Sequence, residues 1–534
     1  MAEIDVLDFI EKEEWSYDES TKVITMPEED FTPNPRGLGY AMFEGMKNNL
    51  NKVAQIDAAT GQEDLYSEFL QRCVRVSLEM KNRGVKARDF ISSCSRNHLN
   101  SYIPYVASAF VGTQLAAIDP GLSLVDKKYL INDSKPVLIF VDEGSESVIK
   151  EILKELELDT IVVCFDTDFE EFLKPKPDED KFAPYEPEDI SETAVVLFSS
   201  GTTGMPKGIC LSHKYILFFS RNCNFEMTLA YASLYYISIT IIMAGSTING
   251  TTRLICDGFK EDKTWIYIEK YKVNYLFVTP YQTVRLYDAK PEGLVSSLSF
   301  MIMAGHQATA EFLDTIRKAM PNTLICYVYG QTELSVIGNP LHALIKDNPT
   351  SIGVPTRGMH YKIVDPETEE ALALTQKGEL RVKSQWTMNG YLNRDNSEVF
   401  DKDGFLKTGD VAYFDENFCL YIVDRVKEMF KFRGMHYVPA KVEAILQNHP
   451  QIQVATVIGV PNFRDENHAM AVVVLVKGST ITAQEIEEYV NGQVEENLKL
   501  RAGVEIIEEM PFTVSGKVSR RCLKEKFVKN DIYH

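Results

Sequence analysis

The sequence lacks a long uncharged hydrophobic run, which limits the classes of protein that it can encode. A membrane-spanning helix needs about 20 consecutive apolar residues, but the longest apolar stretch, residues 231–250, is interrupted by Ser, Thr, Gly and Asn. We therefore expect no membrane span and expect this stretch to form a core or a pocket wall. The N-terminal residues MAEIDVLDFIEKEEW are acidic and do not have the basic and apolar regions of a signal or transit peptide.

Cysteine is sparse and shows no pattern. The nine cysteines form no CxxC pair and no zinc-like spacing, so we interpret them as reduced thiols, which are typical of the cytosol. The C-terminal residues NDIYH differ from the Ser-Lys-Leu peroxisomal signal. We therefore predict a cytoplasmic protein.

Positive charge is also in short supply. The chain has 56 Lys and Arg against 77 Asp and Glu, which gives a net charge of −21. Such a field repels nucleic acid and anionic membranes, so we expect a small-molecule partner and no nucleic acid. Any anionic ligand must be held by local donors. We expect a monomer or a weak oligomer.

What is present is a regular alternation of predicted helices and strands, which indicates an α/β fold with helix-covered sheets. We predict a large N-terminal domain over residues 1–424, with a β-rich subdomain over about 351–424. A small mobile α+β domain follows over 425–534. Thr482 and Glu485 match a capping box at a helix start within it. Several strands end in Gly, Thr or Pro, at the sheet edge where ligands bind in open α/β folds.

The stretch SSGTTGMPKG, residues 199–208, follows the apolar run AVVLF. It does not fit the P-loop pattern, because no Gly-Lys-Ser/Thr follows its first glycine at the right spacing. Its glycines permit unusual backbone torsions, and its hydroxyls, amides and lysine can follow a mobile pyrophosphate. The predicted phosphate-binding residues are Ser199, Ser200, Gly201, Thr202, Thr203, Gly204 and Lys207.

This stretch resembles the signature of the adenylate-forming enzymes, the superfamily of acyl-CoA synthetases, peptide-synthetase adenylation domains and insect luciferases. Five further motifs occur in the order of that superfamily: YGQTE at 329–333, GEL at 378–380, TGD at 408–410, DRVKEMFKFRG at 424–434 and SGKV at 515–518. The resemblance covers nearly the whole chain. It implies ATP-dependent activation of a carboxylic acid to an acyl-adenylate, with release of pyrophosphate.

The resemblance also implies roles for single residues in the nucleotide site. Glu333 is expected to coordinate Mg²⁺ that bridges the ATP phosphates, and Thr332 to bond the α-phosphate. Tyr329 is expected to stack on adenine, with Gly330 beside it. Two ribose contacts are expected as well, from Asp410 and Arg425.

Three further residues are expected to serve the two half-reactions. In the family, the lysine that matches Lys517 neutralises charge between the attacking carboxylate and the α-phosphate. Lys431 and Arg433 lie on the other side of a hinge near Arg425. The family rotates its small domain so that this second stretch enters the site for the second half-reaction.

The acid pocket departs from the family pattern. Tyr235 and Tyr236 stand where many relatives have an aromatic–histidine or His-His pair, and tyrosine carries no charge near neutral pH. His306 follows Gly305 where beetle luciferases have paired glycines. Phe218 and Phe219 lie where those luciferases place an arginine. We therefore expect a different acid.

Three functions remain open from the sequence. The first is a luciferase-like enzyme, such as one of the dipteran glow-worm type, in which O₂ attacks the adenylate of a luciferin with light emission. The second is a fatty or aromatic acyl-CoA synthetase that passes the acyl group to CoA. The third is a catalytically silent family member that binds an acyl ligand.

Overall fold

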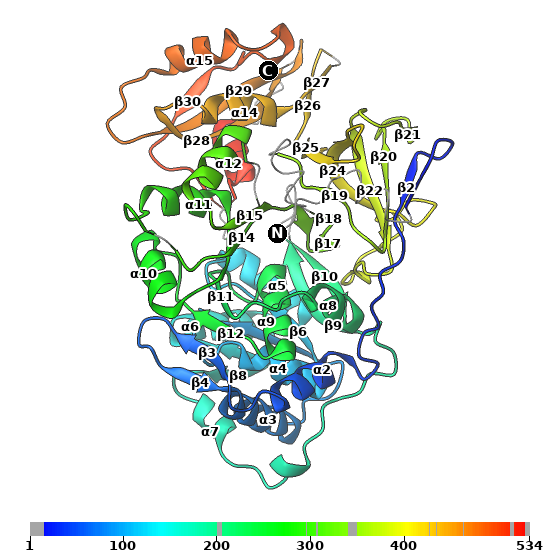
Figure 1. Ribbon diagram of the computed structural model, residues 1–534, viewed down its shortest axis with the longest axis vertical. Coiled ribbons are helices and arrows are strands. Elements are labelled where there is room, and N and C mark those ends of the chain that lie inside the picture. Colours follow the sequence, from blue (N-terminus) through cyan, green and yellow to red (C-terminus); the bar gives the residue numbers. More distant parts are fainter. Residues whose placement is uncertain are drawn as a thin grey trace.

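The computed structural model describes residues 15–199, 206–294, 296–305, 308–339, 350–426, 428–433, 435–462, 464–512 and 517–528. Figure 1 shows a large body and, at the top, a smaller part made of C-terminal elements. Three seven-stranded sheets make up most of the large body. This arrangement confirms the predicted α/β fold with a large and a small domain.

The first sheet has the strand order β23-β10-β9-β6-β5-β7-β8. Its central strands pair in parallel, whereas β10 and β23 are antiparallel. The strands are β5 (Phe90–Cys94), β6 (Gln114–Ala117), β7 (Leu138–Val141), β8 (Ile161–Cys164), β9 (Thr193–Ser199), β10 (Lys207–Ser212) and β23 (Gly390–Tyr391). The helices between these strands are α4 (Ile103–Val111), α5 (Leu124–Ser134), α6 (Glu143–Glu155) and α7 (Phe169–Leu173).

The second sheet has the order β15-β14-β13-β11-β12-β3-β4 and is parallel except for β4. Its strands are β3 (Val53–Asp57), β4 (Glu63–Leu65), β11 (Met227–Ala230), β12 (Thr252–Ile255), β13 (Tyr275–Val278), β14 (Phe300–Met303) and β15 (Leu324–Tyr327). Its helices are α2 (Gly37–Lys47), α3 (Tyr66–Asn82), α8 (His213–Ser220), α9 (Ile237–Asn249), α10 (Glu261–Tyr271), α11 (Pro280–Asp288) and α12 (Ala310–Ala319).

Helix α9 comes from the apolar stretch that the sequence assigned to a core or a pocket wall. Nine of its residues are buried, and Ile241 and Ile242 also line the main cavity. Within the described part of the chain, no helix combines the length and the hydrophobicity that a membrane span requires.

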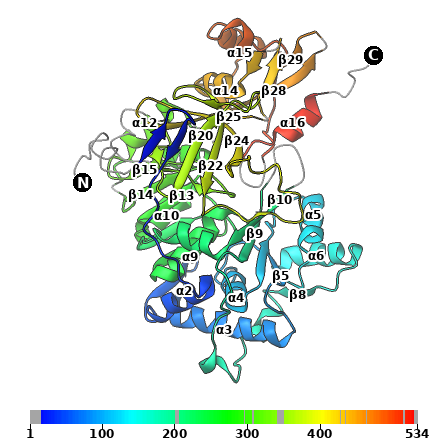
Figure 2. The same ribbon diagram turned by 90° about the vertical axis from the view of Figure 1, so that its right-hand side faces the viewer.

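The third sheet is antiparallel and corresponds to the predicted β-rich region. Its strands are β1 (Ser16–Asp18), β2 (Val23–Thr25), β20 (Met359–Val364), β21 (Ala371–Leu372), β22 (Gly378–Ser384), β24 (Leu406–Phe414) and β25 (Leu420–Arg425). Figure 2 shows the dark blue N-terminal strands beside β20, where β2 pairs with it. The sheet therefore combines segments more than 300 residues apart in the sequence.

The stretch GYLNR lies elsewhere than the sequence suggested. It was expected in the β-rich subdomain, but β23 extends the first sheet by pairing with β10. Two further backbone bonds fix this position: the Asn389 amide donates to the Cys210 carbonyl and the Leu392 amide to the Gly208 carbonyl. This pairing brings Tyr391 into the lining of the main cavity.

The small domain is a three-stranded sheet with helices. Its elements are β26 (Phe430–Phe432), β27 (Met435–Tyr437), α14 (Pro439–Gln447), β28 (Ile452–Asn462), β29 (Glu466–Leu475), α15 (Ala483–Asn491), β30 (Val504–Ile506) and α16 (Arg520–Phe527). The predicted capping box is present at α15, with Thr482 accepting from the Glu485 amide and Glu485 from the Thr482 amide. Short strand pairs β16 (Gly330–Gln331), β17 (Ser335–Val336), β18 (Gly338–Asn339) and β19 (Val354–Pro355) connect the second and third sheets.

Candidate active site

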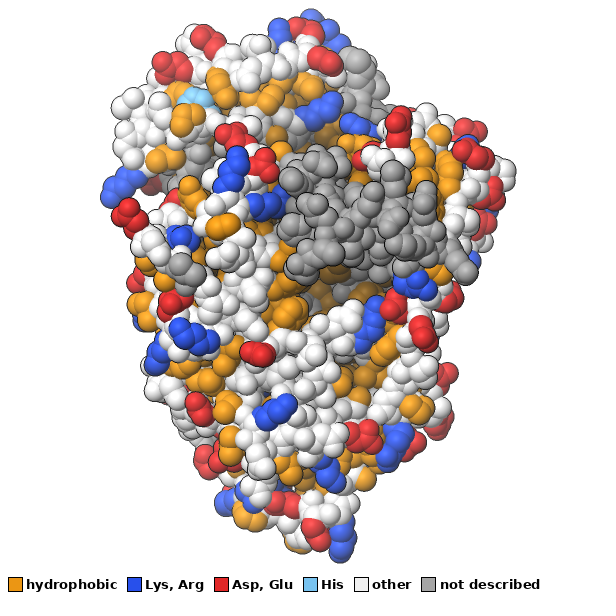
Figure 3. All heavy atoms as spheres, in the orientation of Figure 1, with side chains coloured by type: hydrophobic (Ala, Val, Ile, Leu, Met, Phe, Trp, Pro, Cys, Tyr) orange, Lys and Arg blue, Asp and Glu red, His pale blue; other side chains and the backbone are white. Residues whose placement is uncertain are grey.

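One large cavity, of about 2400 Å³, lies where the carboxyl ends of the first two sheets meet the third sheet and the small domain. Its lining includes Ser199, Thr332, Asp257, Arg425 and Lys517, so all three sheets and the small domain contribute. In the space-filling view, hydrophobic side chains are visible in the hollow at the middle of the face (Figure 3). Most of the predicted site residues that the structure describes converge on this cavity.

The Asp410 carboxylate lies beside Gly409 and Arg425, which line this cavity, and is only 2% exposed. It accepts hydrogen bonds from the Tyr329 hydroxyl and from the Gln331 amide, and Arg425 Nε lies 3.2 Å from it. The register of β24 and β25 places Asp410 directly opposite Arg425. Burial, reinforced by Asp410, raises the pKa of Tyr329, so this phenol stays a donor.

Thr332 and Glu333 follow Tyr329 in the chain, and both line the same cavity. The Tyr391 hydroxyl donates to Glu333 Oε1 at 2.8 Å, and the Tyr215 hydroxyl donates to the Thr332 carbonyl at 2.9 Å. Burial, with Glu333 adding to it, raises the pKa of Tyr391. The buried Tyr215 and the half-buried Tyr391 thus hold the backbone and the carboxylate of the YGQTE motif in place.

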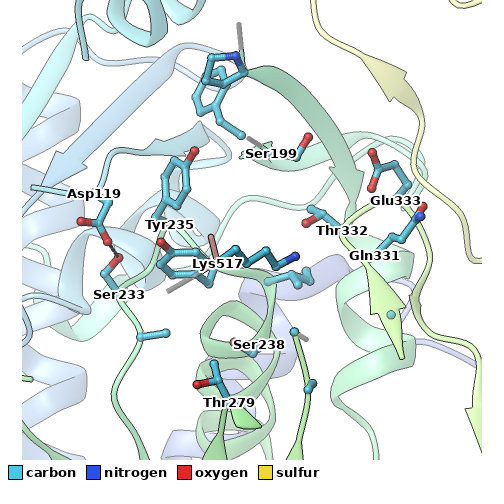
Figure 4. Close-up of a pocket in the computed structure, with 18 of the residues that line it drawn as sticks. Asp119, Ser199, Ser233, Tyr235, Ser238, Thr279, Gln331, Thr332, Glu333 and Lys517 are labelled. Carbon is cyan, nitrogen blue, oxygen red and sulfur yellow. Dashed lines mark hydrogen bonds between the residues drawn. The ribbon is translucent and has the colours of Figure 1, made fainter. Parts of the chain in front are cut away.

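Lys517 reaches this cavity from the small domain. Figure 4 shows its side chain extending between Tyr235 on one side and Gln331 and Thr332 on the other. Burial lowers the pKa of Lys517 to about 8; Arg425 adds to this shift, whereas Asp410 and Glu333 oppose it. The structure therefore brings this C-terminal lysine into the electrostatic field of the two carboxylates.

The two ends of the predicted phosphate loop also line the cavity. Ser199 ends β9, Lys207 begins β10, and the two residues are paired across this hairpin. The Lys207 ammonium lies 4.6 Å from the centre of the Tyr391 ring. The residues at the tip lie outside the described residues: Ser200, Gly201, Thr202, Thr203 and Gly204.

The two tyrosines of the predicted acid pocket precede α9 and line the cavity. Their rings meet edge to face with centroids 5.1 Å apart, and both hydroxyls are buried without a hydrogen-bond partner in the described structure. Burial, and to a smaller extent the charge of Asp119, raises the pKa of both Tyr235 and Tyr236. Both side chains are therefore neutral donors.

Next to the two tyrosines, Ser233 donates a hydrogen bond to Asp119 at 2.7 Å and so joins the segment that precedes α9 to the end of β6. Gly305 also lines the cavity, with φ of +100°, and a Cβ built on it would meet no atom closer than Thr279 Cγ2 at 3.9 Å. His306, which follows it, lies outside the described residues.

The residues predicted for the second half-reaction lie in the small domain. Arg433 forms an ion pair with Asp465 at 2.7 Å, and its side chain is 62% exposed. It is absent from the described cavity lining, which includes Lys517. Lys431 lies in β26 opposite His436, and the direction of its side chain is not described.

Sequence reasoning did not select two of the residues that organise this site. Gln331 lies inside the YGQTE motif and joins Asp410 to the Thr408 carbonyl, the latter at 2.8 Å; its place between two assigned residues was the only available signal. Tyr391 lies outside the motifs. It reaches Glu333 only because β23 pairs with β10.

Comparison with known families and proteins is consistent with this geometry. The model of the AMP-binding enzyme family matches residues 43–392, and the model of the AMP-binding enzyme C-terminal domain matches residues 441–517. The first match alone covers more than half of the chain.

Similar proteins match along nearly their whole length. The chain is 29% identical to luciferin 4-monooxygenase of Photinus pyralis, covering 92% of each chain. It is 28% identical to 4-coumarate–CoA ligase 4 of Arabidopsis thaliana, covering 93% of this chain and 92% of that one.

Solved structures are also similar to this chain over nearly their whole length. The luciferase-like enzyme of the nonluminescent Zophobas morio mealworm is 33% identical, with a TM-score of 0.72 over 76% of this chain and 99% of that one. ATP-bound MatB of Rhodopseudomonas palustris has a TM-score of 0.84 at 22% identity, over 94% of this chain and all of that one. The chain belongs to the AMP-binding enzyme family and is an adenylate-forming enzyme that uses ATP to activate a carboxylic acid.

Proposed function

We propose that the protein is an acid–CoA ligase in which Lys517 completes the adenylation site. The carrying observation is that this lysine shares one cavity with Thr332, Glu333 and Arg425, although it comes from the small domain. A carboxylate oxygen of the acid attacks the α-phosphorus of ATP. The bond from the α-phosphorus to the oxygen shared with the β-phosphorus breaks, and pyrophosphate leaves along the loop between Ser199 and Lys207.

The charged Lys517 lies where negative charge accumulates as the carboxylate approaches the α-phosphate. Asp410 holds the ribose hydroxyls, with Tyr329 and Arg425 fixing its orientation. Thr332 lies one residue from Glu333 and bonds the α-phosphate. These roles agree with the positions that the described side chains occupy.

The single carboxylate of Glu333 fits a magnesium ion that is bound mainly by nucleotide oxygens. Among the described residues, no cluster of three or more His, Cys, Asp or Glu is placed to hold a metal. Mg²⁺ in nucleotide sites needs only one or two protein carboxylates, because phosphate oxygens and water complete its octahedron. Glu333 would supply that carboxylate, and the ion would neutralise charge on the leaving pyrophosphate.

A second arm of the cavity supports a bulky acceptor for the second half-reaction. It follows the carboxyl ends of β5 and β6 and is lined by polar residues that the adenylation site does not use. These include Ser95, Asn97, Asp119, Ser123 and Asp126, with Arg521 of α16 opposite. In this step a thiol attacks the acyl carbon, the acyl–phosphate bond breaks and AMP leaves.

A luciferase-like reaction is the second candidate. It is favoured by the 29% identity with a luciferin 4-monooxygenase. The 33% identical relative, in contrast, is described as luciferase-like and comes from a nonluminescent insect. O₂ is also too small to need the second arm, so we rank the thiol acceptor first.

Purified protein with ATP, Mg²⁺ and a panel of acids separates these candidates. Pyrophosphate release, CoA esters and photons are scored with and without CoA. We expect CoA-dependent thioesters and no light. Light without CoA would establish the luciferase-like reaction, and the absence of ATP–pyrophosphate exchange with every acid would indicate a silent acyl-binding protein.

A further inference from the structure

A third arm of the cavity runs along one face of the second sheet. Every second residue of three neighbouring strands lines it, as the two-residue repeat of a strand requires. These residues are Tyr275, Phe277, Thr279, Phe300, Ile302, Ala304, Cys326 and Val328. We propose that this arm binds the hydrocarbon chain of a linear alkanoic acid and that its aromatic floor sets the accepted chain length; this inference rests on the proposed adenylation function.

The lining residues of neighbouring strands are paired with one another, so the arm runs parallel to the strands. Phe277 is paired with Ile302, and Ile302 with Cys326. The opposite wall comes from α9, with Ile241 and Ile242, and from the segment that ends α8. The arm is therefore a channel between a sheet face and helices, open at the carboxyl edge where Lys517 lies.

Three aromatic rings form the floor of this channel. The Phe225 and Tyr275 centroids are 4.2 Å apart, and Phe225 stacks on Phe300 at 5.2 Å. Tyr275 and Phe300 stack at 5.8 Å across the first residue pair of β13 and β14. Because these residues begin their strands, the floor lies at the end of the sheet opposite the nucleotide.

The channel is long enough to measure a chain. From Thr279 at its mouth to Tyr275 at its floor are four residues of extended strand, about 13 Å, which matches an extended chain of about ten carbons. A single aromatic ring would leave the deeper half of this length unfilled. The dimension therefore favours a linear chain over a compact aryl acid.

The channel also carries no described charged side chain. Phe219 occupies the wall at the end of α8, and the polar lining groups nearby, Asn222 and Ser238, are uncharged. Burial raises the pKa of Cys223 to about 12 and, for Cys326, to about 11, so both thiols stay neutral at physiological pH. A second carboxylate or an ammonium on the acid would be buried without a partner.

A chain-length series tests this assignment. ATP–pyrophosphate exchange is measured with unbranched acids from two to sixteen carbons and with benzoic and 4-hydroxycinnamic acids. Because burial of a methylene gains about 0.8 kcal/mol, we expect kcat/KM to rise about fourfold per added carbon until the channel is filled at about ten carbons. A flat profile, or a preference for the aryl acids, would overturn the proposal.

Two variants change the channel at different depths. Ile302→Trp obstructs the middle and should abolish exchange with decanoic acid while exchange with butyric acid continues. Phe300→Ala removes part of the floor and should move the optimum to longer acids. Val278→Ala is the matched control, because Val278 is fully buried in β13 but does not line the cavity; it should leave the profile unchanged.

Binding of decanoic acid by calorimetry separates this proposal from the proposed function. Binding that Ile302→Trp removes, without exchange for any acid, would uphold the channel and contradict the adenylation assignment. Exchange with aryl acids alone, and no binding of decanoic acid, would contradict the channel and uphold adenylation.

Discussion

The charge of Lys517 links the environment of one side chain to the rate of the first half-reaction. Its pKa is about 8, below the usual 10.5, mainly because of burial. The ammonium is therefore present below about pH 8 and is lost as the pH rises through that value. We expect the adenylation rate to fall above pH 8, as measured by ATP–pyrophosphate exchange.

The Lys517→Arg variant provides a matched test of this pH dependence, because arginine stays charged in proteins. We expect lower activity, since the longer guanidinium displaces the reacting groups, but no decline near pH 8. An unchanged alkaline decline in this variant would assign the titration to another group.

Gln331 is the second residue with a specific expected effect. Because its amide donates to both Asp410 and the Thr408 carbonyl, the Gln331→Leu variant leaves a buried carboxylate short of one donor. Loss of a hydrogen bond to a charged group costs about 1.5–3 kcal/mol, so we expect the KM for ATP to rise about tenfold or more.

Gln385, an exposed glutamine bonded to Glu28 on the surface, supplies the control. Gln385→Leu should leave the KM for ATP unchanged. If both variants behaved alike, the bridge to Asp410 would have no role in nucleotide binding.

Among the structural elements, helix α15 shows most directly how local sequence determines local structure. Its capping box was predicted from Thr482 and Glu485 alone and is confirmed. Thr482→Ala should lower the free energy of unfolding of the small domain by about 1 kcal/mol, as measured by urea denaturation. The substitution Gln484→Ala, at an exposed position in the first turn, should have little effect; equal destabilisation by both would argue against the cap.

Strand β23 illustrates what the sequence could not predict. Its two residues, Gly390 and Tyr391, are too few to show the two-residue repeat of a strand, and their partner β10 lies about 180 residues earlier. The alternation of helix and strand indicated the fold, because long elements carry their period in the sequence. Contacts such as Tyr391 with Glu333 depend on long-range pairing and were therefore missed.

In the whole molecule, the position of the small domain decides which residues face the cavity. Arg520 of α16 lies three residues after Lys517 and pairs with Glu443 of α14 at 2.5 Å. Its Nε lies 3.7 Å from Glu428, beside the end of β25. These contacts join the lysine-bearing segment to α14 and to the residues that follow β25, so they fix the position of this segment within the small domain.

Removal of this arginine should therefore impair adenylation more than the second half-reaction. In the Arg520→Met variant, we expect slower ATP–pyrophosphate exchange, while thioester formation from supplied acyl-adenylate and CoA continues. Lys526→Met, at an exposed position of the same helix that does not line the cavity, is the control. A proportional loss of both half-reactions in Arg520→Met would indicate a purely structural role.

The central claim is that a lysine from the small domain completes the adenylation site and acts in that step alone. The most direct measurement compares Lys517→Ala with the unaltered protein in both half-reactions. We predict that ATP–pyrophosphate exchange falls about 10²- to 10³-fold, the usual effect of removing one group that stabilises transition-state charge, while CoA thioester formation from supplied acyl-adenylate is largely retained. Equal losses in the two assays, or unchanged exchange, would contradict the claim.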